Sequence, residues 1–128
     1  MKVAYVDTSC IVASVLGEEQ AHSLEKRLAN FDSLSSSNLL EAEFLATMTR
    51  EAKGAASWES YLDEIEWIIP QRPLSPELAQ VLAAGYVRGA DCWHLANALF
   101  ASPDPHEMTF LTLDERQRKV AAKLGFQV

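Results

Sequence analysis

The feature that most constrains this chain is an alternation of short β-favouring runs with helical stretches. The clearest β-favouring runs are residues 3–6 and 109–112, and weaker candidates are 34–36, 67–70 and a last edge strand at 126–128. Sequence with helical character lies between each consecutive pair of these runs along the chain. Strands that alternate with helices predict a parallel sheet with helices on both faces. We therefore expect an α/β fold, a three-layer α/β/α sandwich with a short, mostly parallel central sheet.

Glycine and proline divide the helical stretches. Gly17, Gly54 and Gly125 each follow a helical pattern, as glycine commonly does at helix C-termini. Ser75 followed by Pro76 is typical of a helix start, with Ser75 as N-cap and Pro76 as the first helical residue. The expected helices span residues 9–16, 18–29, 38–53, 57–66, 75–87, 91–101 and 114–124.

Length and composition favour one globular domain. The chain has 128 residues, 48% of them hydrophobic, so we expect a single domain over residues 1–128 with its own core. No apolar run approaches the roughly 20 residues of a membrane span, and the opening apolar stretch is too short for a signal peptide. Cys10 and Cys92 form no CxxC pattern, which fits small core residues in a reducing cytoplasm.

The net charge of −7 disfavours stable, sequence-independent binding to DNA, since counterion release rewards basic surfaces. It argues less against a nuclease, because carboxylates gathered for a metal are neutralised only when the metal binds. Positive charge gathers in the last predicted helix, which could be a solvated face or a track for an RNA backbone. Its basic residues are Arg116, Arg118, Lys119 and Lys123.

Acidic residues stand where strands end and helices begin. Asp7 directly follows the first strand, and Asp114 lies two residues after the last of the clear strands. In parallel sheets, ligands bind beyond the carboxyl ends of the strands. Asp91 opens a helix and shares a face with Leu95 and Ala98. A carboxylate that points toward a core is costly unless it is paired, hydrogen-bonded or bound to metal.

A fourth acid belongs to the helix expected over residues 38–53, where Glu41 and Glu43 both qualify. They are separated by about 200° around a helix, so at most one should enter the site, and the helical wheel does not decide between them. Four such acids predict a site for Mg²⁺ or Mn²⁺, which prefer carboxylates and water. One or two such ions can activate water and stabilise the leaving oxygen of a phosphodiester.

Each acid also has a simpler interpretation. Asp7 can cap the helix that follows it, and Asp91 can cap a helix or stabilise its dipole. Thr112 begins a pattern with capping-box spacing, so Asp114 can be partly structural. His94, alone on its helix, is more often a hydrogen-bonded structural residue than a catalytic base.

Four motifs in order resemble those of the PIN-domain family. They are residues 5–9 (YVDTS), 37–45 (SNLLEAEFL), 91–99 (DCWHLANAL) and 109–116 (TFLTLDER), followed by an Ala-x-x-x-Gly ending at 121–125. Each motif is weakly specific, whereas the ordered set spans almost the whole chain.

This resemblance implies a metal-dependent endoribonuclease that uses Mg²⁺ or Mn²⁺. It favours Glu43 over Glu41 as the acid of the second motif. The catalytic and metal-binding residues that it implies are Asp7, Glu43, Asp91 and Asp114, with hydrogen-bond support from Thr8, Ser9 or Thr112. Many relatives carry a further acid where this chain has Arg116, so a second metal would be held weakly or only with substrate.

The resemblance further suggests the toxin of a VapBC-type toxin–antitoxin pair. The partners then expected are an RNA substrate, a small antitoxin and a second copy of the chain as a homodimer, with no membrane association. Two other functions stay open. One is a degenerate PIN-like binding module, for which Arg116 is the supporting feature. The other is an aspartate-based phosphotransfer enzyme or phosphatase, although Ser9 stands where such a phosphatase would need a second Asp.

Overall fold

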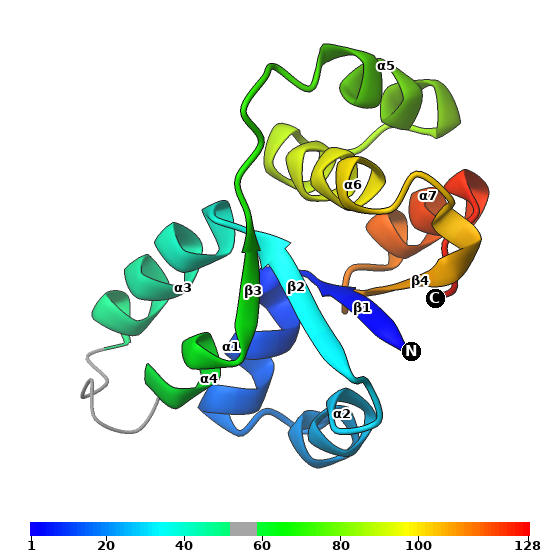
Figure 1. Cartoon of the computed structure of the whole chain (residues 1–128). Coiled ribbons are helices and arrows are strands. Elements are labelled where there is room, and N and C mark those ends of the chain that lie inside the picture. Colours follow the sequence, from blue (N-terminus) through cyan, green and yellow to red (C-terminus); the bar gives the residue numbers. More distant parts are fainter. Residues whose placement is uncertain (52–58) are drawn as a thin grey trace.

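The computed structural model describes residues 1–51 and 59–128, and these form a four-stranded, all-parallel sheet in the order β3-β2-β1-β4 (Figure 1). The strands are β1 (Val3–Val6), β2 (Ser33–Ser37), β3 (Ile65–Ile68) and β4 (Met108–Leu111). The expected short parallel sheet is confirmed.

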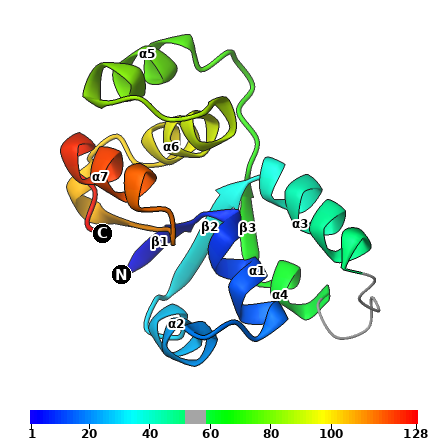
Figure 2. The ribbon, with the colours of Figure 1, turned by 180° about the vertical axis from the view of Figure 1, so that it is seen from behind.

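Helices cover both faces of the sheet (Figures 1 and 2). One layer contains α1 (Thr8–Leu16), α2 (Ala21–Leu28), α3 (Leu39–Arg50) and α4 (Glu59–Asp63). The other contains α5 (Ser75–Ala84), α6 (Gly89–Ala101) and α7 (Glu115–Leu124), with a 3₁₀ turn, η2 (Pro105–Glu107), leading into β4. This arrangement confirms the three-layer α/β/α sandwich.

The two-residue period of β1 explains why there are three layers. Ala4 and Val6 belong to the apolar cluster under α1–α4, whereas Tyr5 belongs to the cluster under α5–α7. Successive side chains of a strand point to opposite faces, so a strand buried on both faces needs a helical layer on each. Tyr5 stacks on Phe110 of the neighbouring strand, with ring centroids 5.1 Å apart.

Several helix ends follow the sequence signals. Gly17 and Gly125 adopt left-handed conformations, with φ of 66° and 106°, and end α1 and α7 as expected. The proposed end of the third helix near Gly54 lies outside the described residues. The start of α5 was predicted one residue too late, because Leu74 is its N-cap and Ser75 its first helical residue. That helix ends at Ala84, before Gly85, and not at residue 87.

The edge of the sheet required two corrections. We expected a helix to residue 66 and a strand over 67–70, but β3 begins at Ile65, which pairs with Leu34 and is buried. Pairing with β2 therefore makes this segment a strand, although its acidic residues favoured a helix. Residues 57 and 58 of that expected helix lie outside the described residues. The edge strand expected at 126–128 is a single parallel bridge between Thr109 and Gln127.

The order of the strands reverses between β1 and β4. From β1 the chain adds β2 and β3 on one side and returns to add β4 on the other. Ligand sites of open parallel sheets lie at such reversals, beyond the carboxyl ends of the strands. The backbone N–H of Asp7 donates to the carbonyl of Leu111 at 2.9 Å, so the ends of β1 and β4 lie together here.

Two further expectations concern the rest of the chain. Cys10 and Cys92 are buried and free, as expected for small core residues. Across residues 1–51 and 59–128, no helix has the length and apolar character that crossing a membrane requires.

Candidate active site

Asp7 lies where β1 ends and α1 begins. Its Oδ2 accepts the backbone N–H of Ser9 at 3.1 Å, so the residue is the N-cap of α1. Its Oδ1 accepts the side-chain amide of Gln117 at 3.2 Å. The residue is 6% exposed. Capping accounts for one oxygen only, and the other is held by Gln117 of α7.

Glu43 extends from α3 toward Thr8 and His94. Its Oε1 accepts the hydroxyl of Thr8 at 2.8 Å and lies 2.8 Å from Nε2 of His94. The nearest polar contact of Glu41 is different, with its Oε1 at 3.5 Å from the side-chain amide of Asn38. The structure therefore brings Glu43, and not Glu41, together with the first residue of α1.

His94 is buried between Tyr5 and Glu43. The backbone N–H of Ser37 donates to the Tyr5 hydroxyl at 2.9 Å, and that hydroxyl lies 2.6 Å from Nδ1 of His94. An ionised carboxylate can only accept hydrogen bonds, so Nε2 of His94 carries a hydrogen and donates the hydrogen bond to Glu43. In the neutral ring Nδ1 then accepts from Tyr5. Nε2 also lies 3.8 Å from Oδ1 of Asp7, which places His94 as a positioning residue between two carboxylates.

Gln117 is fully buried at the start of α7 and connects three parts of the site. Thr112 accepts the backbone N–H of Asp114 at 3.0 Å and donates its own hydrogen to Oε1 of Gln117 at 2.6 Å. The amide is thereby oriented so that its Nε2 faces Asp7 and the carbonyl oxygen of Asp91, the latter at 3.4 Å.

The N-cap of α7 is Asp114, whose Oδ1 accepts the backbone N–H of Gln117 at 2.7 Å. The capping box predicted from Thr112 is therefore wrong. Thr112 lies two residues before the cap and uses its hydroxyl to orient Gln117. The partly structural role considered for Asp114 is present, and its exposed carboxylate also faces a pocket.

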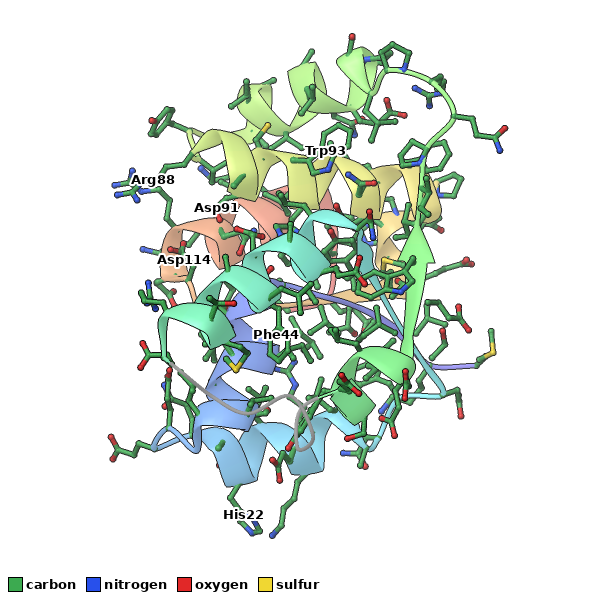
Figure 3. All side chains as sticks on the ribbon, turned by 90° about the vertical axis from the view of Figure 1, so that its left-hand side faces the viewer. His22, Phe44, Arg88, Asp91, Trp93 and Asp114 are labelled. Carbon is green, nitrogen blue, oxygen red and sulfur yellow. The ribbon has the colours of Figure 1, made fainter. Side chains whose placement is uncertain are left out.

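That pocket lies where α6 and α7 begin. Asp91, half-buried in the first turn of α6, lines a space of about 340 Å³ together with Asp114 (Figure 3). Arg88 and Arg116 complete its lining. The four acids thus come from the ends of β1 and β4 and the first parts of α3 and α6.

The surroundings shift the pKa values of two of these carboxylates in opposite directions. The hydrogen bond from His94 holds the pKa of Glu43 below its ordinary value, although partial burial opposes this. Burial raises the pKa of Asp91, and the negative charges of Asp7 and Asp114 raise it further. The surroundings of Asp91 therefore disfavour its charged form.

The carboxylates are chemically suited to a divalent cation, but their side chains do not yet lie in positions that would hold one. The carboxylates are hard oxygen ligands whose mutual repulsion a cation would relieve. As these side chains lie, no three His, Cys, Asp or Glu residues in the described part of the chain form a group that could hold an ion. Binding therefore needs side-chain rotation or bridging water, and Mg²⁺ commonly retains several waters.

Sequence reasoning missed three residues of this region. Gln117 stands three residues after the Asp114 cap, a spacing at which a side chain often caps its own helix, but here it turns inward. Tyr5 reads as a strand residue, and nothing local predicts its contact with His94. Arg88 precedes α6 as its N-cap residue, and only the distant Arg116 and Asp114 make its position notable.

Comparison with known proteins agrees with this geometry. The family model described as PIN domain matches residues 4–123, a range that includes all four acids. A comparison with curated proteins gives no match. The match covers β2, β3 and β4 in full, β1 without its first residue, and α7 without its last residue.

Proposed function

Since this chain belongs to the PIN domain family, whose activity is generally that of a nuclease, we propose that it is a metal-dependent endoribonuclease. The residues proposed to act are Asp7, Glu43, Asp91 and Asp114. The observation that carries this proposal is the meeting of acids from four separate segments at one sheet edge. The raised pKa of Asp91 supports it, because part of the rise comes from the negative charges of the other three acids.

The proposed cofactor is Mg²⁺ or Mn²⁺, held by these four carboxylates. The ion would supply activation of water and stabilisation of charge on the phosphodiester. The chain's own residues supply the orientation. Gln117 fixes Asp7, and both Thr8 and His94 fix Glu43, so two of the four acids are held by hydrogen-bond donors before any ligand binds.

We also propose that residues 1–128 act as one domain and as the toxin of a toxin–antitoxin pair, forming a homodimer that a small antitoxin inhibits. The support is the resemblance of the ordered motifs to VapBC-type toxins. Induced expression should then arrest growth of a bacterial host, and Asp7→Asn should relieve the arrest. Growth arrest that persists with the variant at equal protein levels would contradict the toxin role as we describe it.

Cleavage of RNA by the purified protein tests the main proposal. Asp7→Asn keeps the cap and the shape of the side chain but removes its charge. We expect cleavage in Mn²⁺ to fall at least about a hundredfold, because even residues that only orient metal ligands cost 10- to 100-fold. Asp32→Asn is the matched control, since Asp32 is exposed and hydrogen-bonds the backbone N–H of Lys2 at 2.7 Å. Equal cleavage by Asp7→Asn and the wild type would refute the assignment.

A further inference from the structure

The pocket beside Asp91 and Asp114 combines both signs of charge. Two carboxylates and two guanidinium groups line the same 340 Å³ space, and Figure 3 shows Arg88, Asp91 and Asp114 on one side of the molecule. The two carboxylates of this pocket favour a cation, because the negative charge of Asp114 disfavours that of Asp91. The two arginines favour an anion. A phosphate group that brings a divalent cation with it satisfies both requirements.

The two arginines are available to such a ligand. Three other arginines pair with neighbouring acids, namely Arg50 with Glu51, Arg72 with Glu77 and Arg118 with Glu115. No ion pair within residues 1–51 or 59–128 involves Arg88 or Arg116, although Asp91 and Asp114 share their pocket. Both side chains are exposed. Guanidinium groups bind phosphate oxygens through paired hydrogen bonds, so they are suited to a nucleic-acid backbone.

An aromatic ring adjoins these arginines. Tyr86, between α5 and α6, is 69% exposed, and the guanidinium carbon of Arg116 lies 5.9 Å from its ring centroid. A guanidinium covers one face of a ring and leaves the other for a base. Exposed aromatic rings beside positive charge are the usual elements of single-strand binding, since every base has a face that can stack.

We propose that Tyr86, Arg88 and Arg116 form a binding subsite for single-stranded RNA beside the carboxylates. Arg88 and Arg116 contact backbone phosphates, and Tyr86 stacks against a base next to the bond to be cut. This inference rests on the proposed ribonuclease function and adds the part of the site that holds the strand. It also explains how a chain of net charge −7 attracts RNA, because the attraction is local to the site.

The salt dependence of RNA binding tests the arginines. The probe is a fluorescein-labelled single-stranded RNA of about 12 nucleotides, measured by anisotropy in EDTA so that no cleavage occurs. Each phosphate contact contributes about 0.7 to the slope of log K against log salt, so the double variant Arg88→Gln, Arg116→Gln should lower the slope by about 1.4. We also expect a loss of affinity of at least about tenfold at low salt.

The matched control changes charge equally elsewhere. Lys26→Gln with Arg27→Gln removes two exposed positive charges from α2, the helix of His22 at the far end of the molecule (Figure 3). This control should leave the slope unchanged. A slope that is equal in the wild type and the pocket variant, or that falls equally in the control, would overturn the subsite and leave this surface to a protein partner.

Tyr86 is tested by replacing the ring. Tyr86→Leu should weaken binding about tenfold, whereas Tyr86→Phe, which keeps the ring, should bind as the wild type does. Equal affinities for all three would overturn the stacking role. The subsite and the nuclease function can fail separately. RNA that is bound with the predicted slope but never cut in Mn²⁺ refutes the function alone, and cleavage with unchanged binding by the variants refutes the subsite alone.

Discussion

Glu43 and Asp91 are partly buried carboxylates of one site, but their surroundings act on them in opposite directions. On the α3 side, Glu43 receives hydrogen bonds from Thr8 and His94, and its pKa is lowered. On the α6 side, Asp91 faces other negative charges in a pocket, and its pKa is raised. The folded chain stabilises the first anion by itself and leaves the second for a ligand to stabilise.

This difference divides the site into two halves. We call Glu43 with Thr8 and His94 the preorganised half, and Asp91 with Asp114 the uncompensated half. In the α3 half, donors fixed by Tyr5 and the end of β2 hold the acid before a ligand binds. In the α6 half, no cation within residues 1–51 or 59–128 forms an ion pair with Asp91, so a metal ion would gain the most there. Catalytic sites are commonly built from groups whose pKa values are moved apart in this way.

The largest expected difference between the halves is in metal affinity. Asp91→Asn should weaken Mn²⁺ binding at least about a hundredfold, and Glu43→Gln only about tenfold, because a metal must compete with His94 for the Glu43 oxygen. Isothermal titration calorimetry at neutral pH measures both. Equal losses for the two variants, or a greater loss for Glu43→Gln, would contradict the division that we describe.

Breaking the preorganised half should cost stability. His94→Leu keeps a side chain of similar size but removes the group that accepts from Tyr5 and donates to Glu43. We therefore expect the free energy of unfolding to fall by about 1–3 kcal/mol. His22→Leu is the control, since His22 is exposed on α2 (Figure 3). Urea denaturation compares them. A loss no larger than that of the control would show that the buried contacts do not stabilise the fold.

A smaller loss is expected from the hydroxyl that orients the ring. Tyr5→Phe leaves the backbone N–H of Ser37 and Nδ1 of His94 without this partner, which should cost about 1–2 kcal/mol. Tyr61→Phe is the control, because that hydroxyl makes an exposed contact of 3.3 Å with Glu25. Urea denaturation of both variants in EDTA makes the comparison. Similar midpoints for the two would argue against the chain from Ser37 to Glu43.

The smallest effect is a change of opposite sign in the uncompensated half. The raised pKa of Asp91 means that its contribution to stability is fully present below its ordinary value of 3.8 and is lost as pH rises through the raised pKa. Asp91→Asn has no carboxyl group to ionise, so it avoids that loss. Without metal, the variant should be more stable than the wild type at neutral pH but not at acid pH. The gain should stay below about 1 kcal/mol because the carboxyl is partly exposed. Denaturation in EDTA near pH 3 and pH 7 tests this sign, and a variant destabilised at neutral pH would contradict it.

The sequence predicted the centre of the fold better than its edge. The strand over residues 3–6 and the glycines after α1 and α7 were located correctly, because both signals are local: a buried apolar run and a left-handed turn. The strand at Ile65 was not, since its formation depends on pairing with Leu34. Edge pairing is a property of the assembled sheet.

The same limit applies to the site. The acids after β1 and β4 could be found because strand ends in a parallel sheet meet at one edge. Glu43 could not be separated from Glu41 by the helical wheel, since the contacts that distinguish them come from Thr8 and His94 on other elements. The inward position of Gln117 likewise depends on contacts with Asp7, which follows β1, and with Asp91 of α6. No local sequence pattern contains these contacts.

The most direct test of a shared carboxylate site is a crystal of the protein soaked in Mn²⁺ and measured for anomalous scattering. We predict an anomalous peak beyond the carboxyl ends of β1 and β4, with oxygens of Asp7, Asp91 and Asp114 within about 2.5 Å of the ion or linked to it by water. An occupied Mn²⁺ position elsewhere and none beside these three acids, at a concentration that supports RNA cleavage, would contradict the account.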